Sequence, residues 1–127
     1  MNLAFCRRGV TICAIVALAS LGHIQPAAAD TSVQQCNSHM QAPWVALYED
    51  VNFQGASICI LGTGAVNLYA ISWGDRVSSV NIAAEGHFSE GLFACPEGCL
   101  DFHYGTRISD LRTIGWNDRV AFVSIDR

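Results

Sequence analysis

The amino-acid sequence predicts an all-β domain, a two-sheet Greek-key β-sandwich built from two repeated four-stranded motifs. Apolar and polar residues alternate with a period of two in several short runs, which is typical of half-buried strands. A helical pattern covers only a turn or two, around Leu68–Ile71 and Ser109–Ile114. The sequence also repeats itself after roughly 40 residues, and two four-stranded units of this kind make a Greek-key sandwich.

The first 29 residues have the pattern of a secretory signal peptide. Arg7 and Arg8 precede an apolar stretch from Val10 to Leu21, and the small residues Ala27–Ala29 follow. The apolar stretch is much shorter than the ~20 residues that span a bilayer, so an uncleaved membrane anchor is the weaker alternative. We therefore expect cleavage after Ala29 and a secreted mature chain that has left the membrane.

Between this leader and the folded domain, residues 30–43 are polar and irregular, which predicts a loose N-terminal arm anchored at Cys36. The cysteines that remain after removal of the leader are Cys36, Cys59, Cys95 and Cys99. An even number of cysteines in a short exported chain indicates disulfides.

The pairing of these cysteines is open, because four cysteines allow three combinations. Cys95 and Cys99 flank a Pro-Gly turn that a disulfide could bridge, which would leave Cys36 for Cys59. A metal site of Cys95, Cys99 and His103 is the other interpretation, but it lacks a compact fourth ligand and an oxidising compartment disfavours it.

Four runs with period-two alternation predict the main strands of the domain, Trp44–Tyr48, Ala56–Leu61, Val77–Ile82 and Val120–Ile125. Gly, Asn and Asp between the runs indicate turns. Short strands at this spacing favour a sandwich.

The internal repeat is carried by matching positions, namely Leu68 and Leu111, Trp73–Val77 and Trp116–Val120, and Ile82 and Ile125. These matches place the first motif at about residues 44–84 and the second at about 85–127. We expect pseudo-twofold symmetry between the motifs, with Trp73 and Trp116 in equivalent, largely buried positions.

Each motif also begins with an aromatic hairpin. The residues aligned by the repeat are Tyr48, Phe53, Gly55 and Cys59 in the first copy, and Phe88, Phe93, Cys95 and Cys99 in the second. An aromatic ring at the start of a tight hairpin can fold over the turn, and its burial stabilises the fold by about 2 kcal/mol. Gly55 tolerates a positive φ, whereas Cys95 predicts an altered backbone at the aligned position.

Composition narrows the classes of function. The chain is 51% apolar and 14% charged, which excludes a disordered, solvating polypeptide. All seven basic residues are Arg, and the eleven acidic residues give a formal net charge of −4. A chain with this acidic balance and no basic run is a poor candidate for binding nucleic acid or an anionic membrane. We expect a monomer.

The first motif strongly resembles a βγ-crystallin Greek-key motif in four places, Tyr48–Gly55, Cys59, Asn67-Leu68 and Ser78–Ile82. The second copy, Phe88–Ile125, resembles it less closely, and the two copies cover nearly all of the chain beyond the arm. The joint pattern is much more specific than any single part of it. The resemblance implies a βγ-crystallin-like fold. Members of that family outside the eye lens are often small exported calcium-binding proteins.

The calcium motif of that family has the form Asn/Asp-Asn/Asp-x-x-Ser/Thr-Ser, and both copies here are degenerate. The first copy, Gly74–Ser79, lacks the leading Asn or Asp but keeps the acidic residue and both hydroxyls. The second copy, Asn117–Phe122, keeps the leading pair but lacks both hydroxyls. The resemblance implies that Ser79 ties the hairpin fold instead of binding the ion.

The resemblance implies ligands for two calcium ions, and calcium takes about six to eight oxygen ligands. Asp75 and Ser78 would serve one site together with a backbone carbonyl near Ser89. Asp118 would serve the other site with a carbonyl near Glu49. Because the second motif lacks its hydroxyl, we expect weak binding that is dominated by Asp75. The alternative interpretation is that both aspartates only cap turns.

Enzymatic activity is not expected. The sequence contains no nucleophile elbow, phosphate-cradling glycine loop or His-Glu-x-x-His zinc helix. The histidines are scattered, and none lies near a Ser or Cys partner in the sequence. The function that the sequence favours is a secreted, non-enzymatic structural or binding module with a weak calcium site.

The alternative function is a secreted peptidase inhibitor, or a toxin-like protein, on a crystallin-like fold. Some secreted bacterial peptidase inhibitors have such a fold, and an extracellular protease would then be the partner. An inhibitor needs an exposed, rigid loop with an anchor residue, for which Thr63–Ala70 and Tyr104–Arg107 are the candidates. Arg107 would suit a pocket with an acidic floor, although a solvated Arg is the simpler interpretation.

Overall fold

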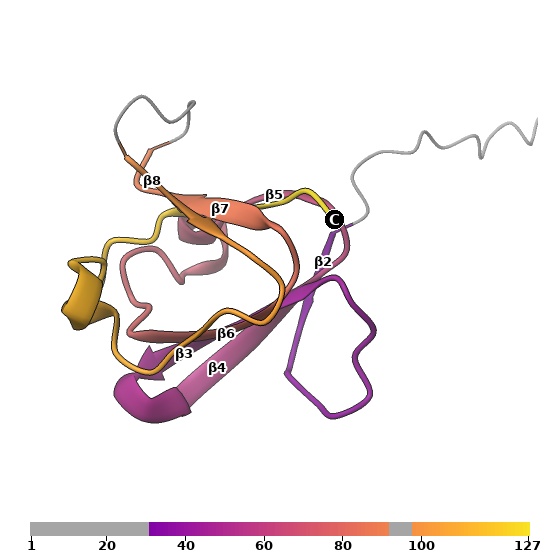
Figure 1. Ribbon diagram of the computed structural model, residues 1–127, viewed down its shortest axis with the longest axis horizontal. Coiled ribbons are helices and arrows are strands. Elements are labelled where there is room, and N and C mark those ends of the chain that lie inside the picture. The colour runs from indigo at the N-terminus through magenta and orange to yellow at the C-terminus, as the bar shows by residue number, and fades with distance from the viewer. Residues whose placement is uncertain (1–30, 92–97) are drawn as a thin grey trace, which may run out of the picture.

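The computed structural model describes residues 31–91 and 98–127. Over this range the chain forms two antiparallel β-sheets that face each other across one core (Figure 1). The predicted signal peptide, residues 1–29, and Cys95 lie outside the described residues. None of the helices in the described ranges has the length and apolar character needed to cross a membrane.

The strands are β2 (Ser32–Gln34), β3 (Trp44–Asp50), β4 (Gln54–Leu61), β5 (Gly64–Asn67), β6 (Ser79–Ala83), β7 (Gly86–Ser89), β8 (Cys99–Phe102), β9 (Arg107–Ile108) and β10 (Phe122–Ile125). Short 3-10 helices lie between them, η2 (Val51–Phe53), η3 (Leu68–Ile71) and η4 (Leu111–Ile114). The four predicted strands correspond to β3, β4, β6 and β10. The two predicted helical turns correspond to η3 and η4.

The two motifs exchange one strand each. The five-stranded sheet has the order β2-β4-β3-β6-β9, and the four-stranded sheet has the order β5-β10-β7-β8. β5 therefore leaves the first motif to pair with β10, and β9 leaves the second motif to pair with β6. The result is the predicted Greek-key sandwich of two four-stranded motifs, extended by β2.

The core confirms the pseudo-twofold symmetry predicted from the repeat. Trp73 is 7% exposed and Trp116 is 8% exposed, and each follows a fully buried leucine, Leu68 or Leu111. The backbone N–H of each tryptophan donates to the carbonyl of that leucine, at 2.7 Å and 2.9 Å respectively. The two tryptophans therefore occupy equivalent buried positions.

The first aromatic hairpin has the expected form. The rings of Tyr48 and Phe53 meet edge to face with their centroids 5.6 Å apart. Gly55 has a φ of +80°, and a Cβ there would lie 2.5 Å from a carboxylate oxygen of Asp50. The backbone at this hairpin thus requires glycine for conformation and for space.

The second hairpin differs from the alignment by one residue, so two predicted matches are wrong. Tyr48 lies opposite Ser79, whereas Phe88 lies opposite Val123 and Ser89 opposite Phe122. Because Ser79 and Phe122 are repeat equivalents, Ser89 is the counterpart of Tyr48. A shift of one residue reverses the face of the sheet, which places Phe88 in the core against Phe102, with the two ring centroids 4.7 Å apart.

The two strand cysteines are not equivalent either, because their cross-strand partners differ by two residues in the repeat: Ser89 is the counterpart of Tyr48 and not of Ala46. Cys59 pairs across the sheet with Ala46, whereas Cys99 pairs with Ser89. The alignment matched aromatic residues with aromatic residues and cysteine with cysteine, but the matched positions are not structurally equivalent.

The N-terminal arm is more ordered than expected. Ser32–Gln34 forms β2, which pairs antiparallel with β4 from Cys59 to Leu61 at the edge of the five-stranded sheet. Its three residues are exposed, so the strand lacks the apolar alternation by which the other strands were predicted. Backbone pairing at a sheet edge requires no particular side chain.

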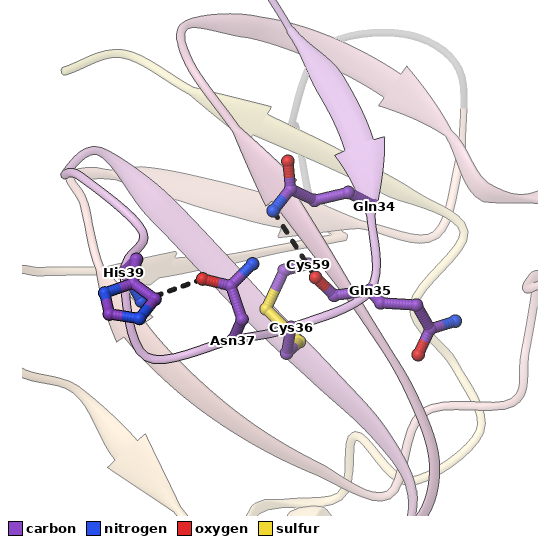
Figure 2. Close-up of a disulfide and its surroundings, with 6 residues drawn as sticks. All are labelled: Gln34, Gln35, Cys36, Asn37, His39 and Cys59. Carbon is purple, nitrogen blue, oxygen red and sulfur yellow. Dashed lines mark hydrogen bonds between the residues drawn. A yellow bond between two sulfur atoms is a disulfide. The ribbon is translucent and has the colours of Figure 1, made fainter.

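The disulfide between Cys36 and Cys59 fastens the arm beside this ladder, which confirms the first predicted pairing (Figure 2). Cys59 is fully buried, whereas Cys36 is only partly buried. Cys99 is also disulfide-bonded. The predicted Cys95–Cys99 pairing involves Cys95, which lies outside the described residues.

Candidate cation site

The two aspartates of the repeated turns occupy matching backbone positions. Asp75 has a φ of +58° and Asp118 a φ of +56°, a left-handed conformation that Asp tolerates better than most residues. The Asp75 N–H donates to the Val120 carbonyl at 3.1 Å, and the Asp118 N–H donates to the Val77 carbonyl at 3.0 Å. Each turn is therefore bonded to the other motif's turn across the pseudo-twofold axis.

This reciprocal bonding gathers Asp118, Ser78 and the Tyr48–Glu49 backbone, which we call the Asp118 group. Asp118 bonds to Val77, the residue before Ser78. The Ser78 N–H donates to the Tyr48 carbonyl at 2.9 Å. Ser78 is 8% exposed, and its hydroxyl makes no hydrogen bond to the described residues. The group thus combines an exposed carboxylate with a hydroxyl that has no other partner there.

An adjoining side chain leaves a further oxygen without a partner. The Asn117 amide nitrogen donates to the Asp118 carboxylate at 2.9 Å. The Asn117 amide oxygen is buried, and it has no hydrogen-bond partner among the described residues. A buried acceptor without a donor costs about 1–3 kcal/mol, so this oxygen would gain from a nearby donor or cation.

The pseudo-symmetric Asp75 group is chemically poorer. It consists of Asp75, Ala121 and Ser89, whose carbonyl accepts from the Ala121 N–H at 2.9 Å. Ala121 offers a methyl group where the other side has the Ser78 hydroxyl. The Ser89 hydroxyl is already used, since it donates to the Gly91 carbonyl at 2.9 Å.

The Asp75 carboxylate is also engaged, because it accepts a hydrogen bond from the Tyr69 hydroxyl. That hydrogen bond is the main cause that raises the pKa of Tyr69, with desolvation and the Asp75 charge adding to it. A cation at the Asp75 group would have to compete with this hydroxyl.

The grouping differs from the one expected from the sequence. Backbone hydrogen bonds connect Asp75 with Ser89 through Val120 and Ala121, and they connect Asp118 with the Tyr48–Glu49 hairpin through Val77 and Ser78. Ser78 does not join Asp75; it lies with Asp118. The cause is the direction of the chain between the turn and β6. Ser78 lies three residues after Asp75, just before β6, and by that point the chain has reached the turn of the other motif. The grouping could not be predicted because the sequence did not reveal that β5 and β9 are exchanged between the sheets.

Ser79 has the structural role that the resemblance implies. Its hydroxyl donates to the Asp50 carbonyl at 2.6 Å and accepts from the Phe53 N–H at 3.0 Å. These bonds hold the first hairpin against β6. The repeat equivalent, Phe122, has no hydroxyl for this purpose.

Two arginines at repeat-equivalent positions were not singled out from the sequence. Arg76 donates through Nη2 and Nε to the Glu49 carboxylate at 2.6 Å and 3.1 Å, and through Nη1 to the Ser72 carbonyl at 2.6 Å. Its guanidinium carbon lies 4.7 Å from the centroid of the Trp73 ring. The recurring Trp-x-Asp-Arg spacing was the signal that pointed to this arrangement.

Arg119 repeats the arrangement in the second motif. It donates to Glu90 at 2.5 Å and to the Gly115 carbonyl, and its guanidinium carbon lies 5.1 Å from the Trp116 ring centroid. Arg119 lowers the pKa of the Glu90 carboxyl, chiefly through the hydrogen bond between them.

The proposed inhibitor loops are ordered. The segment Thr63–Ala70 contains β5 and most of η3. Arg107 lies in β9 with its guanidinium carbon 4.0 Å from the Phe53 ring centroid, so it is stacked on the domain. Tyr104 is the prominent residue of the second loop, because it is 66% exposed.

Glu85 fixes the turn that presents Tyr104. One carboxylate oxygen accepts from the Tyr104 N–H at 2.9 Å, and the other lies 2.9 Å from His103 Nδ1. The Gly105 and Thr106 N–H groups donate to the Ile82 and His103 carbonyls. The hydrogen bond from Tyr104, followed by that from His103, lowers the pKa of Glu85.

The described residues contain no group of three or more His, Cys, Asp or Glu side chains that could hold a metal ion. A site at the Asp118 group would therefore depend on carboxylate, hydroxyl, amide and carbonyl oxygens together. Such a mixed set of oxygens is the type that calcium prefers.

Comparisons with known proteins identify the fold. No protein-family model matches the chain, and no curated protein matches it. A solved structure concerned with the evolution of the eye lens βγ-crystallin domain fold has a TM-score of 0.62 and 23% identity, with 75% of this chain and 97% of that chain covered.

Spherulin 3a from Physarum polycephalum has a TM-score of 0.55 and 24% identity, with 76% of this chain and 97% of that chain covered. A βγ-crystallin from Ciona intestinalis has a TM-score of 0.55 and 22% identity, with 65% and 99% covered. At these identities the likeness is one of fold.

Proposed function

We propose that this chain, which has the βγ-crystallin fold, is a non-enzymatic binding module that holds one Ca²⁺ weakly at the Asp118 group. The proposal includes export, because residues 1–29 have the pattern of a signal peptide and a disulfide closes the arm. The described structure presents no constellation of nucleophile, base and oxyanion donors that would favour catalysis.

The observation that carries the proposal is the pair of backbone hydrogen bonds that brings Asp118 to the Val77–Ser78 segment and Ser78 to the first hairpin. The Asp118 N–H of one motif donates to the Val77 carbonyl of the other, and the Ser78 N–H donates to the Tyr48 carbonyl. Asp118 and Ser78 would hold the ion, with the Glu49 carbonyl as a third oxygen. When bound, the ion would supply a doubly charged link between the motifs. Its stabilising effect would be RT ln(1 + [Ca²⁺]/Kd), because the unfolded chain has no such site.

Calorimetric titration of the oxidised chain beginning at residue 30 tests the proposal. We expect one site with a Kd on the order of 10⁻⁴ to 10⁻³ M, the range of extracellular modules. Asp118→Asn and Ser78→Ala should each weaken binding about tenfold or more. Asp75→Asn is the matched control and should leave the affinity nearly unchanged, because it alters the poorer group.

The opposite ranking would overturn the assignment: if Asp75→Asn abolished binding while Asp118→Asn did not, the ion would lie at the Asp75 group. If the wild type bound no calcium at millimolar concentration, the calcium function would be wrong.

Peptidase inhibition is the second candidate function, and the Tyr104 turn favours it. An exposed aromatic side chain on a turn held by backbone hydrogen bonds has the properties of an interface anchor. The partner would be an extracellular protease. Incubation with a panel of secreted proteases separates this function from calcium binding.

A further inference from the structure

Arg76 stands beside the Asp118 group with its guanidinium fixed on three sides. It is held by the Glu49 carboxylate, by the Ser72 carbonyl and by the face of the Trp73 ring. A planar guanidinium bound in this way keeps its charge in one place, unlike a flexible ammonium group. The guanidinium is therefore held at Glu49, the residue that follows Tyr48 in the Asp118 group.

Arg76 is connected to both sides of that group. Its chain neighbour Val77 accepts the hydrogen bond from the Asp118 N–H. Its ion-pair partner Glu49 directly follows Tyr48, whose carbonyl accepts from the Ser78 N–H. Glu49 is thus shared: its backbone belongs to the Asp118 group and its carboxylate belongs to Arg76.

We propose that Arg76 limits the calcium affinity of the Asp118 group, and this inference rests on the proposed function. The guanidinium engages the Glu49 carboxylate, which would otherwise be available as an additional anionic ligand. It also repels the ion directly. Arg76 occupies an unspecified position of the calcium motif, so the motif itself does not reveal this role.

The size of the effect follows from Coulomb's law. In general, charges of +2 and +1 that are separated by about 8 Å in a water-like dielectric repel enough to change a Kd about fivefold. At physiological ionic strength the Debye length is also about 8 Å, so the repulsion falls there to about twofold. Release of the Glu49 carboxylate adds to this change and is less sensitive to salt.

The experiment compares calcium titrations of the wild type and Arg76→Gln at low ionic strength and at about 0.15 M salt, where the Debye length is about 8 Å. We expect Arg76→Gln to bind calcium at least fivefold more tightly at low ionic strength, with a smaller gain in salt. Arg76→Lys keeps the charge but loses the two-atom contact with Glu49 and the stacked geometry, so its affinity should lie between those of the wild type and Arg76→Gln. Melting curves without calcium show that each variant is folded.

Arg119→Gln is the matched control, because it removes the same set of contacts around Trp116, Glu90 and Gly115. It should change the affinity of the Asp118 group less than Arg76→Gln does, because the carboxylate partner of Arg119 is Glu90 and not Glu49. If Arg76→Gln and the wild type bind equally, or if Arg119→Gln tightens binding just as much, the inference is wrong while the calcium function stands. If neither the wild type nor Arg76→Gln binds calcium, both proposals fail. Binding by Arg76→Gln alone supports the inference.

Discussion

Glu85 illustrates how one half-buried side chain sets the conformation of a functional candidate. Its carboxylate accepts a hydrogen bond from the Tyr104 N–H and contacts the His103 side chain, so it holds these two neighbouring residues in place. Its own N–H donates to the Arg127 carbonyl at 2.6 Å. The turn that exposes Tyr104 therefore depends on a charged glutamate.

The lowered pKa of Glu85 predicts an acid sensitivity that belongs to this residue. A carboxyl with a lowered pKa in the folded state stabilises the fold above its unfolded pKa, about 4.3, and loses that contribution as the pH falls through the folded pKa. Glu85→Gln should therefore be less stable than the wild type at pH 7. The difference should shrink as the pH falls below about 4.

Chemical denaturation of the two proteins at pH 7 and at about pH 3 measures this difference. A stability gap of the same size at both pH values would show that the loss comes from the amide substitution and not from the charge.

At the scale of single elements, β2 depends on its disulfide more than on its own pairing. Its ladder is three residues long and all three side chains are exposed. Such a strand buries little apolar surface, and an isolated ladder of this length is marginal in water. The Cys36–Cys59 bond supplies the restraint that keeps the arm on the edge of β4.

Cys36→Ser should release the arm and lower the free energy of unfolding by about 2–4 kcal/mol, the usual effect of a disulfide that closes a loop of this length. Urea denaturation measures the total effect. Hydrogen exchange separates the parts: amides of β2 should exchange rapidly, while those of β3 keep most of their protection. Retained protection in β2 would show that the ladder suffices without the disulfide.

The elements that the sequence predicted correctly are those with a strong period. β3, β4, β6 and β10 carry alternating apolar side chains into one core. η3 and η4 lie at matching positions of the repeat, and each begins with a buried leucine. β2, β5 and β9 were not predicted, because each is short and is defined by backbone pairing with a distant strand. Such pairing leaves little trace in local sequence.

The sequence supplied the candidate ligands of the site but not their spatial grouping. The resemblance implied five candidate ligands, Asp75, Ser78, Ser89, Asp118 and Glu49. Which of them lie together depends on two turns that cross between motifs, a relation of tertiary structure. The contacts of Arg76 and Arg119 were missed for a similar reason, since each arginine pairs with a glutamate far away in the sequence.

At the scale of the whole molecule, the exchange of β5 and β9 means that neither motif completes its own sheet. The first motif alone would lack the strand that covers the edge of β6, and the second would lack the strand beside β10. The two motifs also share one core, to which both contribute large apolar residues. The halves should therefore fold only together.

Separate chains of residues 31–84 and 85–127 should each be largely unfolded by circular dichroism. Mixing them should restore β-structure, because the interface between them is the core itself. Tryptophan fluorescence reports the same event through the burial of Trp73 and Trp116. A half that folds alone as a monomer would contradict the dependence of each sheet on its exchanged strand.

The crossing of the two turns also ties the histories of the repeats together. Each of the two groups takes its aspartate from one copy and the residue at its hydroxyl position from the other, so a substitution in one copy changes the group that contains the other copy's aspartate. The alanine at position 121 illustrates this: it lies in the second copy, yet the group it impoverishes is that of Asp75. After a duplication, two such repeats therefore cannot drift independently.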